Sequence, residues 1–455
     1  MKVFLAVIIC KILYFIGKKL GRGSSLPGKI VLRLFPDVLL RLKLPETIIA
    51  VTGSNGKTTT TELIVHAIEA SGKTVGWNYE GSNQTEGVAT LLLRTASFGG
   101  RVKRDVIVME CDERYAVKIF ENVRPSVLLV TNLVRDQITR NGHHEFIEDR
   151  IRASIEAAGD TVKLVLNTDD PYVAALAYGF DGSADGMLIP ISNDVSWFGV
   201  TSTSVEHPHI GMYDDGAFCP MCKARMTYIY RIAGHYGSYN CDTCGLKRVD
   251  PEVETSIKKS GYLSFGESVK LRVKHPGITS AYNFCAAVAT CKAAGLDVAD
   301  SVKALDEYEL TSGRVLRLPT GGSDDLLLLS KHENSFAYNS SMLWIVEQKK
   351  PCTVIVLVED ISRKYYTSET SWFWDIDFDI LADENVKSVA LVGRYTNELA
   401  MRFVMSAVDQ SKITCLADLG DLRGFVDRTA VGSIYAVTCF SDKVKLLKAL
   451  GAEGR

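Results

Sequence analysis

Short runs of apolar residues alternate with helix-like stretches through the first half of the chain. These runs cover residues 48–51, 106–110, 126–131 and 163–167, and each ends in polar residues. Continuous apolar runs of this length are typical of buried parallel strands, with the stretches between them forming crossover helices. Because ligands gather at the carboxyl ends of such strands, we expect a doubly wound α/β domain with its site there.

The alternation stops near residue 195. Residues 195–270 are rich in Gly, Tyr and Cys, and we interpret them as an insertion. Helical periodicity returns over 280–294 and 298–305, and the segment Thr311-Ser312-Gly313-Arg314 is typical of a hinge. Three more apolar runs predict a second set of strands alternating with helices, at 353–358, 388–392 and 433–437.

These patterns predict three parts of the chain. An amphipathic N-terminal segment would cover residues 1–45, a central α/β domain 46–310, and a smaller Rossmann-like α/β domain 311–455. A length of 455 residues is enough for two or three domains that each bury a core.

Composition narrows the class of protein. The hydrophobic share of 46% and the charged share of 23% are ordinary for a globular protein, and a net charge of −2 gives no footprint for nucleic acid. Of the eleven cysteines, seven are scattered, mostly among apolar residues. We therefore expect buried free thiols and a reducing, cytoplasmic compartment.

The N-terminus is apolar and basic. Residues 3–16 are apolar except for Lys11, and Lys18, Lys19 and Arg22 follow. The run is shorter than the roughly 20 residues that cross a bilayer, and no signal cleavage site clearly follows it. Two interpretations stay open: a helix packed on the protein, or transient contact with the inner membrane surface.

The strand at 48–51 leads directly into a Gly-rich turn and a helix-forming segment. Glycines let backbone N–H groups converge on phosphate oxygens, and the helix adds its positive dipole end. Lys57 would neutralise the β- and γ-phosphates, and Thr58 would reach Mg²⁺. Val51 replaces the first glycine of the usual phosphate-loop pattern, so a chance Gly-Lys-Thr is the alternative. The expected ATP-binding residues are Gly53, Ser54, Asn55, Gly56, Lys57, Thr58 and Thr59.

Polar residues at other strand ends supply candidate partners for this loop. Glu110 and Asp112 follow one strand, where a carboxylate could hold Mg²⁺, and Asn132 and Asp136 follow the next. Capping of a helix is the alternative for either pair. Asn283, near the start of a predicted helix, could reach the base or the ribose.

The insertion carries two cysteine pairs. Cys219-Pro-Met-Cys222 and Cys241-Asp-Thr-Cys244 are separated by 18 residues. Each pair can supply two thiolates to one tetrahedral Zn²⁺, and the spacing matches a zinc ribbon over about 215–248.

Two other roles for these residues are weaker. A redox function is possible for a Cys-x-x-Cys motif, but two paired motifs favour a closed structural zinc site. His235 lies between the pairs and could replace one ligand, although a surface histidine is the simpler interpretation. Four thiolates leave no open coordination position, so we assign the zinc to folding or to shaping a contact surface.

Taken together, these residues resemble the Mur ligase superfamily, ATP-dependent enzymes that form amide bonds through an acyl-phosphate. Residues 50–58, Ala-Val-Thr-Gly-Ser-Asn-Gly-Lys-Thr, are close to its A-V-T-G-T-N-G-K-T loop, which explains the missing first glycine. Residues 110–113 resemble its E-x-D-E, residues 131–137 its T-N-L-x-R-D-Q, and Arg314 the start of its C-terminal domain. A four-cysteine ribbon in the central domain resembles one branch, the synthetase subunit of lipid II isoglutaminyl synthase.

The resemblance implies a fold, a reaction and a partner. It implies a Mur ligase-like central P-loop ATPase domain with an inserted four-cysteine zinc ribbon, and ATP, Mg²⁺ and Zn²⁺ as cofactors. Lys57 and Glu110 would be catalytic, Thr58 and Glu110 would bind magnesium, and Asn283 and Arg314 would bind the nucleotide. The reaction would amidate the α-carboxylate of D-glutamate in the lipid II stem peptide. Ammonia would come from a GatD-type glutaminase subunit in a heterodimer at the cytoplasmic membrane face.

One C-terminal segment bears on this partner. Residues 368–375, Ser-Glu-Thr-Ser-Trp-Phe-Trp-Asp, resemble a D-x-S-W-x-W-D motif whose first carboxylate orients the partner's Cys-His pair. Glu369 takes the place of that Asp, and Trp372 and Trp374 could equally be aromatic anchors. Residues 331–336 also depart from the family's K-N-P-A-G. These departures bear on the coupling to a glutaminase and not on the ATP site.

Two alternative functions stay open from the sequence. A Mur-type ligase related to folylpolyglutamate synthase would add an amino acid without a partner, but the ribbon and the tryptophan motif disfavour it. A nucleotide-binding scaffold without ligase chemistry is disfavoured because Lys57, Thr58 and Glu110 are present.

Overall fold

The computed structural model places most of the chain in defined positions. It describes residues 1–455 except 20–23, 181–187, 202–213, 259–261, 267–268, 275–276, 311–313, 362–369 and 453–455. Residues 311–313 of the predicted hinge at 311–314, and Glu369, fall outside the described residues.

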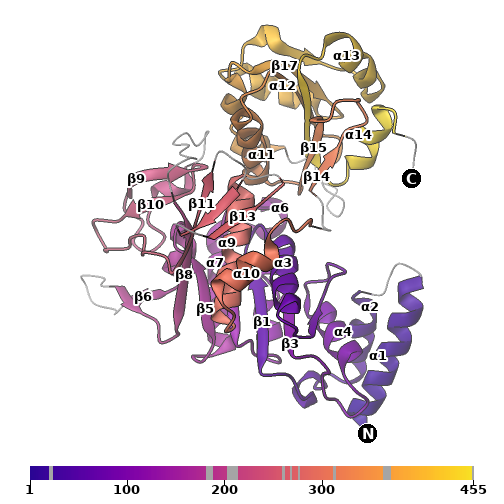
Figure 1. Ribbon diagram of the computed structural model, residues 1–455, viewed down its shortest axis with the longest axis vertical. Helices are drawn as coiled ribbons and strands as arrows, with labels where there is room; N and C mark the ends of the chain where they lie inside the picture. Colours follow the sequence, from indigo (N-terminus) through magenta and orange to yellow (C-terminus); the bar gives the residue numbers. More distant parts are fainter. Residues whose placement is uncertain are drawn as a thin grey trace.

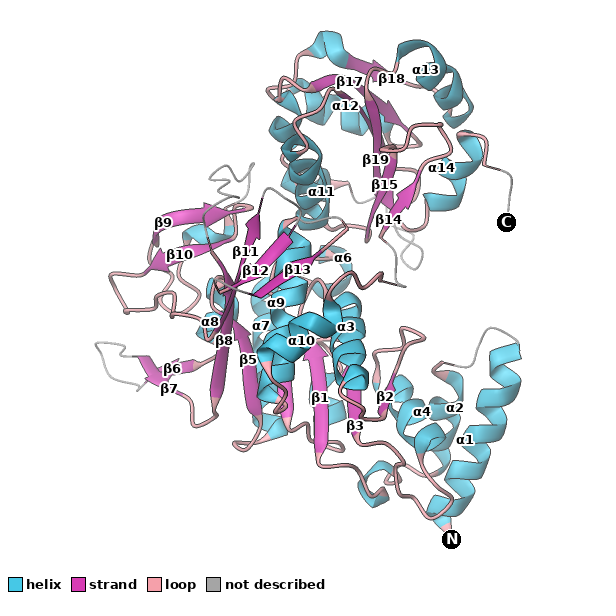
Figure 2. Ribbon diagram, viewed as in Figure 1, coloured by secondary structure: helices cyan, strands magenta, loops and turns pink. Residues whose placement is uncertain are grey.

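A nine-stranded sheet forms the centre of the first domain (Figures 1 and 2). Its order is β13-β12-β11-β8-β5-β4-β1-β3-β2, and the strands are parallel except at the edge formed by β12 and β13. The bounds are β1 Thr47–Thr52, β2 Val75–Trp77, β3 Val106–Glu110, β4 Val127–Val130, β5 Lys163–Asn167, β8 Val195–Val200, β11 Val253–Lys258, β12 Tyr262–Phe265 and β13 Val269–Arg272. The four predicted strands are confirmed as β1, β3, β4 and β5.

Both faces of this sheet are covered, which is why its strands are apolar throughout. Along β1, Ile48 and Ala50 enter one core, whereas Ile49 and Val51 enter the other. One face packs against helices α3, α9 and α10, and the other against α4, α5 and α7. The bounds of the helices in this domain are α3 Lys57–Ala70, α4 Thr85–Thr95, α5 Ala116–Phe120, α6 Ile138–Asn141, α7 His144–Ala158, α8 Pro171–Ala175, α9 Ile278–Ala293 and α10 Val298–Leu305.

Two N-terminal helices, α1 (Lys2–Lys19) and α2 (Leu26–Leu34), extend the second face. Ala6, Val7 and Cys10 of α1 are buried in the same core as α4. At Gly28 of α2 an added Cβ would lie 1.9 Å from the Glu86 carbonyl oxygen, so only glycine permits this approach. Packing on the protein is thereby confirmed. However, α1 differs from the amphipathic helix expected, because large apolar side chains also lie on its exposed side.

No helix among the described residues combines the length and the apolar character needed to cross a membrane.

The predicted insertion is narrower than 195–270. β8, β11, β12 and β13 belong to the main sheet, and the inserted part is the ribbon around the hairpin of β9 (Thr227–Ile232) and β10 (Tyr236–Asn240). β11 and β13 alternate buried and less buried positions, so no continuous apolar run marks them in the sequence as it marks the central strands. A second small hairpin pairs β6 (Tyr178–Phe180) with β7 (Leu188–Pro190).

The C-terminal part is a separate, smaller α/β domain, as the sequence predicted (Figure 1). Its sheet has the order β14-β15-β19-β16-β17-β18, and only β14 is antiparallel to its neighbour. The bounds are β14 Val315–Arg317, β15 Leu326–Ser330, α11 Ser335–Glu347, β16 Cys352–Leu357, β17 Val386–Val392, α12 Thr396–Val404, β18 Ile413–Cys415, α13 Leu422–Thr429, β19 Ser433–Cys439 and α14 Lys443–Ala449. Short 3-10 helices lie at Leu39–Arg41, Asp215–Ala217, Ser371–Asp375, Phe378–Ala382, Gln410–Lys412 and Leu419–Asp421.

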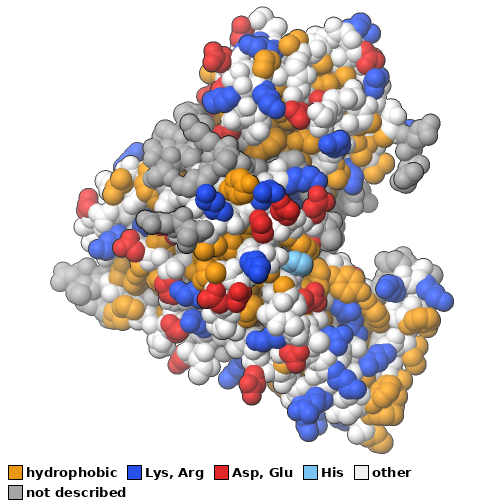
Figure 3. Space-filling model, in the orientation of Figure 1, with side chains coloured by type: hydrophobic (Ala, Val, Ile, Leu, Met, Phe, Trp, Pro, Cys, Tyr) orange, Lys and Arg blue, Asp and Glu red, His pale blue; other side chains and the backbone are white. Residues whose placement is uncertain are grey.

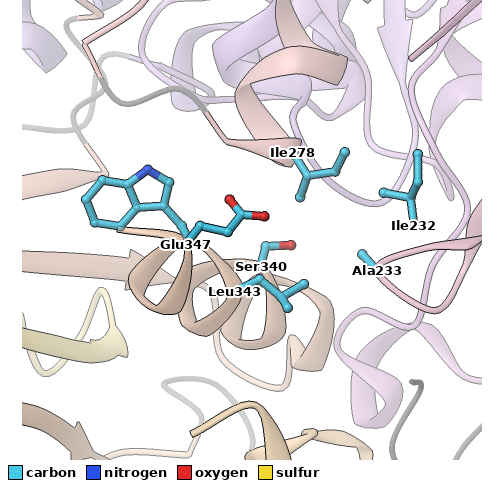
Figure 4. Close-up of a pocket in the computed structure, with 7 residues that line it drawn as sticks. Ile232, Ala233, Ile278, Ser340, Leu343 and Glu347 are labelled. Atoms are coloured by element: carbon cyan, nitrogen blue, oxygen red, sulfur yellow. The ribbon is translucent and has the colours of Figure 1, made fainter. Parts of the chain in front are cut away.

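The ribbon, the central domain and the C-terminal domain meet at one small pocket (Figure 4). Ile232 from the ribbon, Ile278 from α9 and Leu343 from α11 line it. Nearby, an added Cβ on Gly277 would lie 2.9 Å from Trp344 of α11. Trp344 of the C-terminal domain therefore packs closely against the backbone at the start of α9.

Cysteines outside the ribbon behave as expected of free thiols. None forms a disulfide, and all are buried except Cys415, which is exposed.

Candidate active site

The predicted phosphate loop connects β1 to α3 through residues 53–56. Gly53 and Gly56 have φ values of 119° and 80°, a region that favours glycine. Contacts restrict these positions further, because an added Cβ would lie 2.4 Å from Thr131 Oγ1 at Gly53 and 2.2 Å from Asn283 Oδ1 at Gly56. Only glycine fits at these two positions of the turn, which brings backbone N–H groups to the start of α3.

Residues that follow β4 hold the loop from the side. The Asn55 backbone N–H donates to Asn132 Oδ1 at 2.9 Å, and the Ser54 N–H donates to the Asn132 carbonyl at 2.8 Å. The Thr131 hydroxyl donates to the Asn55 carbonyl at 2.7 Å. Asn132 therefore positions the loop, and does not cap a helix.

Lys57, the first residue of α3, is buried and paired. Its ammonium donates to Glu113 Oε1 at 2.6 Å and to the Ser54 carbonyl at 3.2 Å, and it also contacts the Gly53 carbonyl. Burial alone would lower the pKa of Lys57, but the carboxylates of Glu113 and Glu110 outweigh it and hold that pKa above its usual value. The lysine is thus a fixed positive charge beside the loop. Glu113 was not predicted as a site residue, although it belongs to the E-x-D-E stretch.

Glu110 and Asp112 separate into different roles. Glu110 ends β3 beside Val51 of β1, and one of its carboxylate oxygens accepts from Asn83 Nδ2 at 3.0 Å. The side chain of Asp112 is engaged with two arginines, at 3.3 Å from Arg114 Nε and in contact with Arg140. Of the two carboxylates, Glu110 is therefore the one suited to a cation beside the phosphate loop.

A segment of the C-terminal domain reaches the same loop. Lys331 donates to the Ser54 carbonyl at 3.1 Å and lies 3.3 Å from Asp136. Asn334 Nδ2 donates to Asn55 Oδ1 at 2.6 Å and to Asp136 Oδ1 at 2.7 Å. In the sequence this segment stood out only as a departure from the family pattern. Its place directly after β15 was the available signal, because strand ends collect site residues.

Further contacts extend this junction. Glu333 accepts from the Thr139 hydroxyl at 2.6 Å, and its carbonyl accepts from the Gln137 N–H at 2.9 Å. Burial lowers the pKa of Lys331, with the positive charges of Lys57 and Arg314 adding to the effect and Asp136 opposing it. Several cations thus converge on one region next to the loop.

The two predicted nucleotide contacts also lie at this junction. Asn283 Oδ1 accepts from the Thr60 hydroxyl at 3.4 Å, which places it over the start of α3. Burial lowers the pKa of Arg314, while the carboxylates of Asp136 and Glu110 oppose that shift. Both side chains, which are far apart in sequence, are therefore brought to the phosphate loop.

This arrangement fits ATP and a divalent cation. The amide Nδ2 of Asn55 is buried and has no protein partner, so a donor stands ready beside the loop. The glycine cradle, Lys57 and Lys331 supply the backbone donors and the positive charge that phosphates need. Thr58 and Glu110 offer the oxygen ligands that Mg²⁺ prefers.

The four ribbon cysteines form one cluster. Their sulfur atoms all lie within 4.8 Å of one another, with Cys219 and Cys244 at 3.5 Å and Cys222 and Cys241 at 3.4 Å. Tetrahedral zinc with Zn–S bonds of about 2.3 Å needs sulfurs roughly 3.8 Å apart. The cluster therefore fits a four-cysteine zinc site, as predicted.

His235 is neither a ligand nor a surface residue, so the surface prediction is wrong. It is buried between the rings of Tyr172 and Tyr236, and its Nε2 lies 3.1 Å from Asp170 Oδ1. Asp170 in turn accepts from the Leu133 N–H at 2.8 Å. The ribbon hairpin is thereby fastened to the strand ends beside the phosphate loop.

The region next to Glu369 is only partly described. Trp372 is buried in the core of the C-terminal domain, with its ring 5.4 Å from that of Tyr338. The guanidinium of Arg402 lies 5.8 Å from the ring of Trp374. Trp372 thus serves as a core anchor, one of the two interpretations left open from the sequence.

Two family models match the chain. The Mur ligase middle domain matches residues 51–206, which include the phosphate loop. The MurT ligase C-terminal domain matches residues 331–440, beginning at the lysine that contacts that loop. With the fold and site described above, these matches place the chain among the Mur-type ligases.

Comparison with individual proteins narrows the class. The chain is 27% identical to "Lipid II isoglutaminyl synthase (glutamine-hydrolyzing) subunit MurT" of Streptococcus pneumoniae, over 99% of this chain and 98% of that protein. Two solved structures share the fold. A pseudomurein peptide ligase type C from Methanothermus fervidus has a TM-score of 0.67 and 18% identity, over 91% of this chain and 80% of that one. MurF ligase from Thermotoga maritima, in complex with ADP, has a TM-score of 0.56 and 14% identity, over 93% and 83%. Within its class, the chain is similar nearly end to end to MurT.

Proposed function

We propose that this chain is the ligase subunit of a lipid II-amidating enzyme. It would use ATP to convert the α-carboxylate of D-glutamate in the lipid II stem peptide to the amide, giving D-isoglutamine. The observation that carries the proposal is the meeting of a MurT-type C-terminal domain with the phosphate loop through Lys331 and Asn334. The name and nearly complete coverage of the pneumococcal relative support the reaction.

The chemistry needs a good leaving group on a poor electrophile. ATP supplies a phosphoryl group that turns the carboxylate into a mixed anhydride, which ammonia can attack. The protein's task is to orient the carboxylate and to neutralise charge. Lys57 and Lys331 would face the developing negative charge, and Glu110 with Thr58 would hold Mg²⁺. Asn283 and Arg314 would fix the rest of the nucleotide.

The ammonia would come from a separate glutaminase of the GatD type, forming a heterodimer with this chain. The word "subunit" and the term "glutamine-hydrolyzing" in the relative's name support a partner. A shielded path would keep ammonia neutral, and neutrality matters because ammonium has no free electron pair. Glu369 is proposed to orient the partner's catalytic histidine. The acceptor is anchored in the membrane, so we place the enzyme in the cytoplasm at the inner membrane face.

Reconstitution tests this proposal. The purified chain, a GatD-type glutaminase, ATP, glutamine and lipid II are mixed, and the product is analysed by mass spectrometry. The expected product is lighter than lipid II by the mass difference between a hydroxyl group and an amino group. Amidation with ammonium chloride but not with glutamine would overturn the proposed ammonia supply by the glutaminase. The proposed ligase activity would then still hold. Unchanged glutamine-dependent activity in Glu369→Ala, with Glu359→Ala as a control, would refute the role of Glu369.

The same assay separates the alternative function. A ligase that adds an amino acid would consume ATP with an amino acid present and no glutaminase, and its product would gain a residue mass. The match of the MurT ligase C-terminal domain disfavours this outcome.

A further inference from the structure

Helix α1 is apolar on both of its long sides. Its inner side is made of small residues, Ala6, Val7, Cys10 and Gly17, which are buried against the protein. Larger apolar side chains occupy the outer side at helical spacing. These outward residues and their exposed fractions are Phe4 48%, Leu5 43%, Ile12 54%, Phe15 64% and Ile16 50%. A helix that is hydrophobic all round normally has a second apolar phase around it.

The apolar side is continued by a neighbouring loop. Phe98, which follows α4, is 54% exposed, and its ring centroid lies 5.9 Å from that of Phe4. The Lys11 ammonium lies 5.1 Å from the Phe98 ring, and the Lys19 ammonium lies 4.9 Å from the Phe15 ring. We call the five outward residues of α1 together with Phe98 the α1 patch.

The helix that carries the α1 patch and its neighbour α2 are both basic. Helices α1 and α2 contain no Asp or Glu, although the whole chain has a net charge of −2. The first 36 residues carry seven basic side chains: Lys2, Lys11, Lys18, Lys19, Arg22, Lys29 and Arg33. Figure 3 shows hydrophobic and basic side chains together over α1, at the lower right edge of the molecule.

We propose that the α1 patch docks on an anionic lipid surface, with α1 lying in the plane of the interface. The apolar side chains would enter the boundary between headgroups and acyl chains, and the lysines would reach the anionic headgroups. Four lysines in 18 residues are costly at the centre of a bilayer but favourable at its surface. The lysines of α1 are the complement of an anionic membrane, and the nearby acidic side chain of Glu80 accepts a hydrogen bond from the Tyr14 hydroxyl at 2.6 Å.

This inference goes beyond the proposed amidation. It assigns a particular surface to membrane contact, and it needs neither ATP nor an acceptor. If both hold, α1 keeps the central domain next to the surface on which a lipid-linked acceptor is displayed.

Vesicle co-sedimentation of the full chain tests the proposal. One set of vesicles contains phosphatidylglycerol with phosphatidylcholine, and the other contains phosphatidylcholine alone. We expect binding to the anionic vesicles, with weaker binding to neutral vesicles and at high salt. In the double variant Ile12→Glu/Phe15→Glu the binding should fall by roughly tenfold or more, because two charges replace the exposed apolar side chains that would enter the lipid interface.

A matched control comes from α12. Met401 and Val404 are each 63% exposed and have the same three-residue spacing as the tested pair. Met401→Glu/Val404→Glu should bind vesicles as the wild type does. The melting temperature shows whether each variant is folded. If the first variant does not fold, Lys11→Gln/Lys18→Gln, which keeps the apolar contacts, should still lose binding to anionic vesicles.

Three results would overturn the proposal. The first is that the wild type does not sediment with anionic vesicles, and the second is that the folded α1 variants sediment as well as the wild type. The third is that the wild type self-associates or binds the glutaminase through α1, with the α1 variants abolishing that association. Each of these leaves the amidation proposal untouched, because the vesicle assay contains no substrate.

Discussion

Asn334 offers a direct test of how the C-terminal domain acts on the phosphate loop. Its side chain is fully buried and makes three hydrogen bonds. Its Nδ2 donates to Asn55 at 2.6 Å and to Asp136 at 2.7 Å, and its Oδ1 accepts from the Ala337 N–H at 2.8 Å as the N-cap of α11. Asn334→Ala removes all three hydrogen bonds. The helix α11 then loses its N-cap, and the domain junction loses two hydrogen bonds.

The two losses have different sizes. A missing N-cap costs about 1 kcal/mol of stability. The bond to the Asp136 carboxylate contributes about 1.5–3 kcal/mol, and the neutral bond to Asn55 about 1 kcal/mol. If the junction bonds also hold the loop during the reaction, losing the charged bond alone lowers kcat/KM by roughly 10- to 100-fold.

Two further variants separate these contributions. Asp297 caps α10 by accepting from Ala299 and Asp300, away from the junction, so Asp297→Ala should lower stability by about 1 kcal/mol and leave turnover unchanged. Asn334→Asp keeps a capping oxygen but removes the donor, so its turnover should fall as in Asn334→Ala. Stability is measured by thermal unfolding and turnover by ADP release. If Asn334→Ala behaves like Asp297→Ala, the junction does not act on the loop.

Three other predictions address the loop, the ribbon and acid stability. Lys57→Ala should lower ATP turnover by about 10²- to 10³-fold, and full turnover would refute the site. The purified chain should contain zinc in equal molar amount, and its removal or Cys219→Ser should lower the melting temperature, whereas an unchanged value would exclude a structural role. Burial would raise the pKa of Asp112, but Arg140 and Arg114 outweigh it and hold that pKa below its usual value. Its contribution to stability is therefore present above the unfolded pKa of about 3.9 and is lost as pH falls through the folded pKa. Arg140→Ala should raise the folded pKa of Asp112 and therefore make this acid-induced loss of stability smaller, as followed by urea unfolding between about pH 3 and 7; an unchanged acid profile would contradict the pairing.

Local patterns sufficed for the central strands, the phosphate loop and the zinc ribbon. Apolar runs such as 48–51 are buried on both sides, and the cysteine spacing directly reflects one tetrahedral site. Strands β11 and β13 were missed because their alternating exposure resembles loop sequence. β11 joins the sheet by pairing with β8, and β13 joins it through β12; no local pattern contains these pairings.

Residues that act through long-range contacts were the hardest to predict. Lys331 and Asn334 lie more than 270 residues from the loop that they contact, so only the folded chain brings them together. His235 was interpreted as a surface residue, because no local pattern around it indicates burial. Its burial depends on the ring of Tyr172, more than 60 positions earlier.

The exposure of Cys415 has a practical consequence. Burial raises the pKa of Cys10, Cys291 and Cys439 to about 12 and that of Cys352 to about 11, which suppresses their reactive thiolate forms. Zinc would shield the ribbon thiols, leaving a thiol on the C-terminal domain as the preferred target of a maleimide dye. The native sequence thus already carries an attachment point for a fluorophore, from which movements of that domain against the phosphate loop could be followed in real time.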